Sequence, residues 1–156
     1  MLNVYTDTSV IGGCFDIEFK EFSNALFEEF KSGIKHLVIS DLVILELKQA
    51  REEVTLKLDE VPDSFKAEHK NTPEAVELAE AYISGGALSN KSFNDALHIA
   101  IATLSKAEVL ASWNFKHIVN LNRIKLYNSI NLQMGYPIIE IRTPREILKP
   151  NDHEKS

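Results

Sequence analysis

The sequence predicts an α/β domain with three layers, in which helices cover both faces of a central and mainly parallel sheet. Short apolar runs of strand length alternate with segments of helical periodicity along the chain. Strands separated by helices in this way pair in parallel and are buried on both faces. A length of 156 residues with 44% hydrophobic residues suits one domain with a sizeable core. We therefore assign residues 1–148 to one domain and expect the charged residues 149–156 to be a disordered tail.

The first half of the chain begins with an apolar strand at residues 2–6, followed by a break at Gly12 and Gly13. A helix is then predicted by a stripe of apolar residues at helical spacing, which are Phe19, Phe22, Leu26 and Phe30. We expect this stripe to lie in the core rather than in an interface. A buried strand follows at residues 36–39, and Ser40 is placed to cap a helix that runs to about Glu53. Residues 54–70 are charged and contain Pro62, so we expect irregular helix and loop there.

The second half continues the alternation. Thr72 and Pro73 supply the N-cap and first position of a helix that Gly85 ends. Ser92 and Asp95 have the spacing of a capping box for a helix over residues 93–105. Strands are predicted at residues 109–112 and 138–141, with a polar helix over residues 121–134 between them. Thr143 begins a short terminal helix.

Composition narrows the class of protein. No segment reaches the roughly 18 consecutive apolar residues of a membrane span, and the amino terminus lacks a basic stretch followed by an apolar region. We therefore expect a cytoplasmic protein without a membrane partner. The single cysteine, Cys14, fits a reducing compartment and a buried thiol. A net charge of −6 argues against binding nucleic acid by bulk attraction and leaves that role to local basic patches.

Three acidic residues lie far apart in the sequence, each beside or within an apolar segment. Asp7 follows the first strand, Glu46 interrupts an apolar helix, and Asp95 opens another apolar helix. Ligands of parallel sheets bind beyond the carboxyl ends of strands, where the strand order reverses. Asp7 and Asn114 both follow strands, so we expect them to face one crevice. Carboxylates crowded there would share protons or hold a divalent cation.

Each acid also has an ordinary structural interpretation. Asp7 can cap the turn after its strand, and Glu46 can be an exposed helical residue paired with Lys48. Asp95 can cap amides in the first helical turn, where an acid suits the helix dipole. His98 lies in an apolar run, and we interpret it as a hydrogen-bonded core histidine, or one that supports a ligand, rather than as a metal ligand.

Asn114 begins a segment with two possible roles. The asparagine can cap the helix that follows, or offer its carbonyl oxygen to a metal or a water molecule. A basic cluster follows it, with aromatic residues interleaved; the cluster comprises Lys116, His117, Arg123 and Lys125, and the aromatic residues are Trp113 and Phe115. Such charges are ordinarily solvated, and contact with phosphate or a nucleic-acid backbone is the alternative.

Four segments in this order resemble the PIN-domain family, above all its VapC-type members, the toxin halves of bacterial and archaeal toxin–antitoxin pairs. They are residues 4–10, 39–47, 94–102 and 110–117, and the resemblance spans residues 2–148. It implies a PIN-like fold and a metal-dependent endoribonuclease that hydrolyses RNA phosphodiester bonds. It also implies RNA as substrate, a cognate antitoxin protein and a homodimer.

The same resemblance implies roles for particular residues. The catalytic set is Asp7, Glu46, Asp95 and Asn114, and the three acids of this set hold Mg²⁺ or Mn²⁺. Ser9 supports the first carboxylate. Together with Lys116, His117 and Arg123 of the basic cluster, Ser9 is the predicted substrate-binding set.

Asn114 departs from the pattern, because many family members carry a further Asp at this position. An amide in place of a carboxylate removes one negative charge and weakens binding of a second metal. A PIN-like module that binds RNA or protein without cutting is therefore the first alternative. A second alternative is an unrelated α/β scaffold in which the acids are caps and surface charges.

Overall fold

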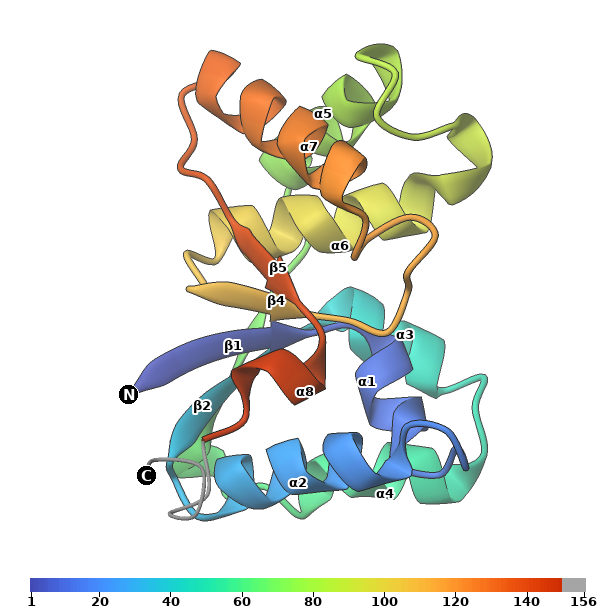
Figure 1. Ribbon diagram of the computed structural model, residues 1–156, viewed down its shortest axis with the longest axis vertical. Coiled ribbons are helices and arrows are strands. Elements are labelled where there is room, and N and C mark those ends of the chain that lie inside the picture. The colour runs from blue at the N-terminus through green and yellow to red at the C-terminus, as the bar shows by residue number, and fades with distance from the viewer. Residues whose placement is uncertain (150–156) are drawn as a thin grey trace.

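The computed structural model describes residues 1–149 and shows a parallel sheet between two layers of helices (Figure 1). Within these residues the sheet has five strands in the order β3-β2-β1-β4-β5, and every neighbouring pair is parallel. The strands are β1 (Leu2–Thr6), β2 (Lys35–Ser40), β3 (Lys66–His69), β4 (Val109–Ala111) and β5 (Glu140–Arg142). The predicted three-layer fold with a parallel sheet is confirmed.

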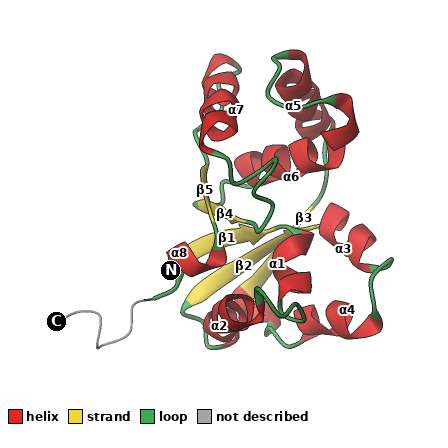
Figure 2. Cartoon of the chain, turned by 45° about the vertical axis from the view of Figure 1, so that its right-hand side comes forward, coloured by secondary structure: helices red, strands yellow, loops and turns green. Residues whose placement is uncertain are grey.

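Two groups of helices cover the faces of this sheet (Figures 1 and 2). One layer consists of α5 (Pro73–Ser84), α6 (Phe93–Leu104) and α7 (Leu121–Gln133). The other contains α1 (Thr8–Gly13), α2 (Lys20–Lys31), α4 (Glu52–Asp59) and α8 (Pro144–Ile147), and α3 (Asp41–Leu47) follows β2 directly. Among the described residues no helix is long and apolar enough to cross a bilayer.

Strand β1 lies at the centre of the sheet, and the strand order reverses between β1 and β4. The chain adds β2 and β3 on one side of β1 and later returns to add β4 and β5 on the other. At the carboxyl ends of the two central strands, the backbone N–H of Asp7 donates to the carbonyl of Ala111 at 3.3 Å. The residues after β1 and β4 therefore face one another at the place where such sheets bind ligands.

Two predicted segments differ from the structure. The helix predicted from Ser40 to about Glu53 ends at Leu47, and a second helix, α4, begins at Glu52. The Thr55 hydroxyl of α4 donates to the Leu47 carbonyl at 2.9 Å, which satisfies an acceptor at the end of α3. The sequence 66–69, predicted as irregular, is the edge strand β3. This strand pairs only with β2, and as expected of an edge strand its residues are polar or small, so its sequence carries no apolar strand pattern.

The segment after β1 also contains a short helix, α1, where only a glycine break was predicted. Asp7 is its N-cap, and its carboxylate accepts from the Val10 backbone N–H. The stripe of α2 lies in the core as predicted at Leu26 and Phe30, which are fully buried, while Phe19 and Phe22 are partly buried against that core.

Two further expectations concern the thiol and the tail. Cys14 is buried as predicted, and burial raises its pKa to about 11 although Lys57 opposes this change. Of the tail predicted at residues 149–156, only Lys149 is described, and its backbone N–H donates to Glu29 Oε2 at 2.9 Å. Residues 150–156 lie outside the described residues.

Candidate functional site

Asp7 is a buried carboxylate held by three donors. Its side chain is only 4% exposed. Oδ1 accepts from the Ser9 hydroxyl at 2.6 Å and from the Val10 N–H at 3.3 Å, and Oδ2 accepts from the Ser112 hydroxyl at 2.6 Å. Burial raises the pKa of Asp7, although the hydrogen bonds from Ser112 and Ser9 favour its ionised form. Asp7 therefore caps the turn as predicted, through the Val10 N–H. The hydroxyls of Ser9 and Ser112 also orient its carboxylate, which capping alone does not require.

Glu46 lies on α3 with its side chain about one-third exposed and directed at α6. Its Oε1 accepts from His98 Nε2 at 2.7 Å and from the Thr8 hydroxyl at 2.5 Å. Burial alone would raise the pKa of Glu46, but the hydrogen bond and charge of His98, together with the hydrogen bond from Thr8, outweigh burial and lower it. The interpretation of Glu46 as an exposed residue paired with Lys48 is wrong, because its salt-bridge partner is His98.

His98 connects Glu46 to a buried chain of hydroxyl groups. The ring is 3% exposed, and its Nδ1 lies 2.8 Å from the Tyr5 hydroxyl, which lies 2.7 Å from Ser40 Oγ. Ser40 Oγ also accepts from the Val43 N–H. An ionised carboxylate only accepts, so His98 Nε2 donates to Glu46, while Nδ1 and the hydroxyls of Tyr5 and Ser40 continue the chain into the core. Burial raises the pKa of Tyr5, so the phenol keeps its proton.

This chain satisfies both ring nitrogens of His98, as expected for a hydrogen-bonded core histidine. It also fixes the direction in which the ring donates, and so holds the Glu46 carboxylate beside the start of α1.

Asp95 is paired with a residue from the loop after β4. Its Oδ2 lies 2.9 Å from His117 Nδ1, and both side chains are about one-quarter exposed. Ser92 is the N-cap of α6 but makes no capping hydrogen bond with its side chain. The predicted capping box of Ser92 and Asp95 is therefore wrong: the carboxylate contacts His117 across the site instead.

Asn114 links this pair to Asp7. Its backbone N–H donates to Ser112 Oγ at 2.9 Å, and its side-chain Oδ1 accepts from the His117 N–H at 3.0 Å. Asn114 thus caps the turn that follows β4. A continuous series of hydrogen bonds runs from Asp7 through Ser112, Asn114 and His117 to Asp95.

The basic residues of the predicted substrate-binding set have different surroundings. Lys116 is exposed, whereas the Arg123 guanidinium donates to the Ala87 carbonyl at 2.7 Å and so ties α7 to the loop after α5. His117 is held by Asp95 on its side chain, and the Tyr127 hydroxyl donates to its carbonyl. Of the three, Lys116 is the one whose charge faces solvent.

The three acids have the donor chemistry of a magnesium or manganese site, because these hard cations prefer carboxylate oxygens. The structure brings Asp7, Glu46 and Asp95 to one end of the sheet, where each is hydrogen-bonded to neighbouring hydroxyl or imidazole groups. Within residues 1–149, however, no group of three or more Asp, Glu, His or Cys side chains is placed so that it could hold an ion. The donor types fit a cation, and their present side-chain positions do not form its site.

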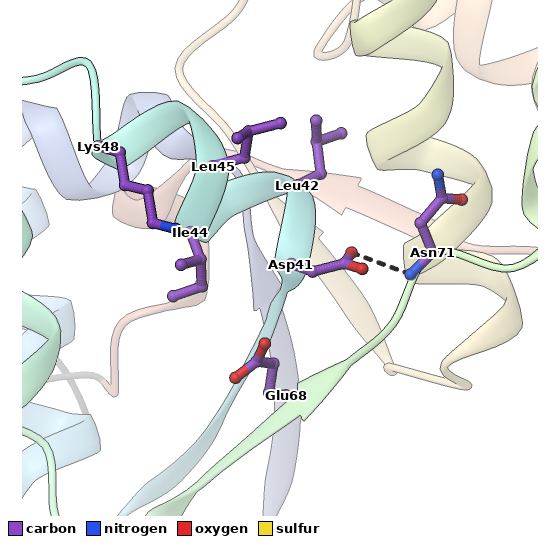
Figure 3. Close-up of a pocket in the computed structure, with 7 residues that line it drawn as sticks. All are labelled: Asp41, Leu42, Ile44, Leu45, Lys48, Glu68 and Asn71. Atoms are coloured by element: carbon purple, nitrogen blue, oxygen red, sulfur yellow. Dashed lines mark hydrogen bonds between the residues drawn. The ribbon is translucent and has the colours of Figure 1, made fainter.

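A surface pocket of about 350 Å³ lies along α3 and is lined by none of these three acids (Figure 3). It is bordered by α3 and the edge strand β3, and its lining residues are Asp41, Leu42, Ile44, Leu45, Lys48, Glu68 and Asn71. The Asn71 N–H donates to Asp41 Oδ1 at 2.9 Å across it. The pocket is therefore separate from the candidate site.

Sequence reasoning missed several residues that orient the acids. Thr8 and Ser112 each contact an acid directly, and Tyr5 and Ser40 act through His98. Ser112 had a usable signal, because it follows β4 as Asp7 follows β1. Tyr5 had none, since an aromatic residue in a buried strand is ordinary.

Comparison with solved structures finds bacterial proteins of the same fold. VapC20 of Mycobacterium tuberculosis, a Sarcin-Ricin loop cleaving toxin, superposes with a TM-score of 0.54 at 11% identity, covering 73% of this chain and 92% of that chain. VapBC2 of Rickettsia felis, in a structure with a bound DNA fragment from the VapBC2 promoter, gives a TM-score of 0.54 at 17% identity. The match covers 91% of this chain and 98% of that chain. No protein-family model and no curated protein matches the sequence. This chain therefore has the fold of the VapC-type PIN-domain toxins.

Proposed function

We propose that this chain is a metal-dependent endoribonuclease that hydrolyses RNA phosphodiester bonds. The observation that carries the proposal is the series of hydrogen bonds from buried Asp7 to Asp95, located where the strand order of the sheet reverses. These hydrogen bonds hold the carboxylates in place at the position where ligands of such sheets bind. The shared fold with VapC20, a Sarcin-Ricin loop cleaving toxin, supports the same class of reaction.

The proposed ligands of Mg²⁺ or Mn²⁺ are Asp7, Glu46 and Asp95. When bound, such an ion supplies an acidified water and neutralises charge on the phosphate. The protein's part is orientation, because Ser112 fixes Asp7 and His98 fixes Glu46 before any ligand arrives.

The RNA backbone would approach the same edge of the sheet. Lys116, exposed in the loop after β4, is proposed to contact a phosphate next to the one that is cleaved. Ser9 acts on the carboxylate rather than on RNA, since its hydroxyl donates to Asp7 Oδ1 and accepts from the Trp113 N–H at 3.0 Å.

Cleavage of a fluorescently labelled single-stranded RNA by the purified protein tests this function. We expect cleavage with Mg²⁺ or Mn²⁺, none with EDTA, and a loss of about 100-fold or more in Asp95→Asn, because charge stabilisation at a reaction centre has that magnitude. The matched control is Glu77→Gln, which neutralises an acid that is exposed on α5 and has no ion pair among the described residues. Cleavage that persists in EDTA, or in Asp95→Asn, would contradict the proposal.

A second candidate function is a PIN-like module that binds RNA or protein without cutting it. Two observations favour it: position 114 is an amide whose oxygen already accepts from His117, and the acids do not form a metal site in their present positions. Calorimetric titration with Mn²⁺ separates the candidates, because the module predicts no binding at millimolar metal.

Asn114→Asp is expected to raise the affinity for Mn²⁺ roughly tenfold, because it adds a carboxylate in the middle of the series that runs from Asp7 to Asp95. The aspartate can still accept from the His117 N–H, so the turn keeps its cap. Asn122→Asp, which adds the same charge at an exposed position of α7, is the control for long-range electrostatics. Calorimetry measures both, and equal effects in the two variants would remove position 114 from the metal site.

We also propose that the chain acts in the cytoplasm as the toxin half of a toxin–antitoxin pair, as a homodimer that a small antitoxin protein blocks. The VapBC2 structure, which includes DNA from the promoter, supports the pairing. Light scattering after size exclusion measures the dimer. Co-expression with the product of the adjacent gene tests the antitoxin, which should co-purify and suppress RNA cleavage.

A further inference from the structure

The loop after β4 presents a half-exposed aromatic ring next to the candidate site. Phe115 has 51% of its surface exposed and follows Asn114 directly. Its two chain neighbours are an amide and an exposed cation, Lys116. A polar group and a positive charge therefore flank the ring along the chain, an arrangement suited to a ligand that is both aromatic and anionic.

The ring belongs to a cluster of aromatic side chains, the platform, made of Phe19, Trp113 and Phe115. Phe19 and Trp113 stack with ring centroids 4.3 Å apart and planes inclined by 17°. Phe115 lies 6.3 Å from Trp113 and 6.4 Å from Phe19, tilted against both. Phe115 is the member of the platform that is most exposed, because Trp113 is 8% exposed and Phe19 is partly buried.

Hydrogen bonds hold the platform in a fixed position relative to Asp7. The Trp113 indole N–H donates to Ser23 Oγ at 2.8 Å, and the Trp113 backbone N–H donates to Ser9 Oγ, whose hydroxyl donates to Asp7. Gly13 allows this approach, since a Cβ there would lie 2.8 Å from Trp113 Nε1 and 2.6 Å from Ser23 Oγ. The platform is thus built into the frame that orients the carboxylate.

We propose that an unpaired base of a single-stranded RNA substrate stacks on Phe115, the exposed ring of the platform. This proposal rests on the proposed ribonuclease function. Base faces stack on exposed aromatic rings regardless of sequence. A chain with a net charge of −6 has little bulk attraction for RNA, so a contact that does not depend on charge has to supply part of the affinity. Lys116 then contacts the adjoining phosphate, and the stacked base sets the register of the strand at the site.

Trp113 provides the measurement, because it is the chain's single tryptophan and lies in the platform. In EDTA, where cleavage is absent, oligoadenylate is titrated into the protein while Trp113 fluorescence and the anisotropy of labelled RNA are recorded. We expect quenching of Trp113 and binding roughly tenfold weaker in Phe115→Ala and Phe115→Leu, with Phe115→Tyr close to wild type. An abasic ribose-phosphate oligomer and duplex RNA should bind the wild type as weakly as oligoadenylate binds Phe115→Ala.

Leu132→Ala is the matched control, since Leu132 is an apolar residue of α7 that is 63% exposed. Equal RNA affinity in Phe115→Ala and wild type, with both proteins folded by circular dichroism, would overturn the proposal. Loss of antitoxin capture in Phe115→Ala with RNA binding intact would overturn it too and make the ring a protein-binding surface. Binding that depends on Phe115 without any cleavage by the wild type would instead reject the ribonuclease and leave the stacking site standing.

Discussion

Asp7→Asn is expected to abolish RNA cleavage, by about 100-fold or more, and at the same time to stabilise the metal-free protein at neutral pH. The loss of activity follows from removing the negative charge at the centre of the proposed ligand set. The gain in stability follows from burial, which makes the ionised carboxylate costly despite its serine partners. Opposite changes in function and stability are typical of residues retained for a reaction.

The pH dependence of stability explains why Asp7→Asn should stabilise the protein at neutral pH. The pKa of Asp7 is raised in the folded state above its ordinary value of 3.8, so the folded protein binds the proton more tightly than the unfolded chain. The free energy of unfolding therefore falls as pH rises from about 3.8 through the folded pKa, and the full penalty remains above it. Asp7→Asn removes this fall, so the variant should be more stable than wild type at neutral pH and the two proteins should converge in acid.

Thermal denaturation in EDTA, followed across this range for Asp7→Asn, wild type and the exposed control Glu77→Gln, measures the difference. A variant less stable than wild type at neutral pH would show that the hydrogen bonds from Ser9 and Ser112 outweigh the burial of charge.

His98→Ala is expected to lower the free energy of unfolding by about 3 kcal/mol, the largest loss of stability expected from the site. The change leaves the buried Tyr5 hydroxyl without its imidazole partner and Glu46 without the donor on His98, and it opens a cavity on α6. His98→Gln is the informative companion, because its amide can still donate to Glu46 while it fills much of the space. We expect it to lose about half as much.

Urea unfolding of the metal-free proteins measures these losses, and Mn²⁺ calorimetry separates packing from orientation. If His98 orients Glu46 for a metal ion, His98→Gln should bind Mn²⁺ more tightly than His98→Ala. The difference in their binding free energies should exceed the difference in their free energies of unfolding.

Tyr5→Phe should lower the free energy of unfolding by about 1 kcal/mol, since it removes one buried hydrogen bond on each side of the hydroxyl. Equal stability of His98→Ala and wild type would mean that the buried chain contributes nothing to the fold.

Much of the architecture follows from local pattern. The apolar run of β1, the apolar helix α6 and the cap at Thr72 are each encoded by neighbouring residues, so their positions could be predicted. The edge strand β3 could not, because its four residues are polar or small and become a strand only through pairing with β2. The break between α3 and α4 could not be predicted either, since the hydrogen bond from Thr55 to Leu47 joins two separate helices.

The candidate site divides in the same way. The alternation of strands and helices predicted by itself that Asp7 and Asn114, which each follow a strand, would face one crevice, and the resemblance to PIN domains added Glu46 and Asp95 to the set. Only the tertiary structure decided how each carboxylate is held, because Ser112, Thr8 and His98 lie between 38 and 105 residues away from the acids they contact. Periodicity records which face of an element is buried, whereas a hydrogen bond between distant segments depends on how the layers pack and leaves no periodic trace in the chain.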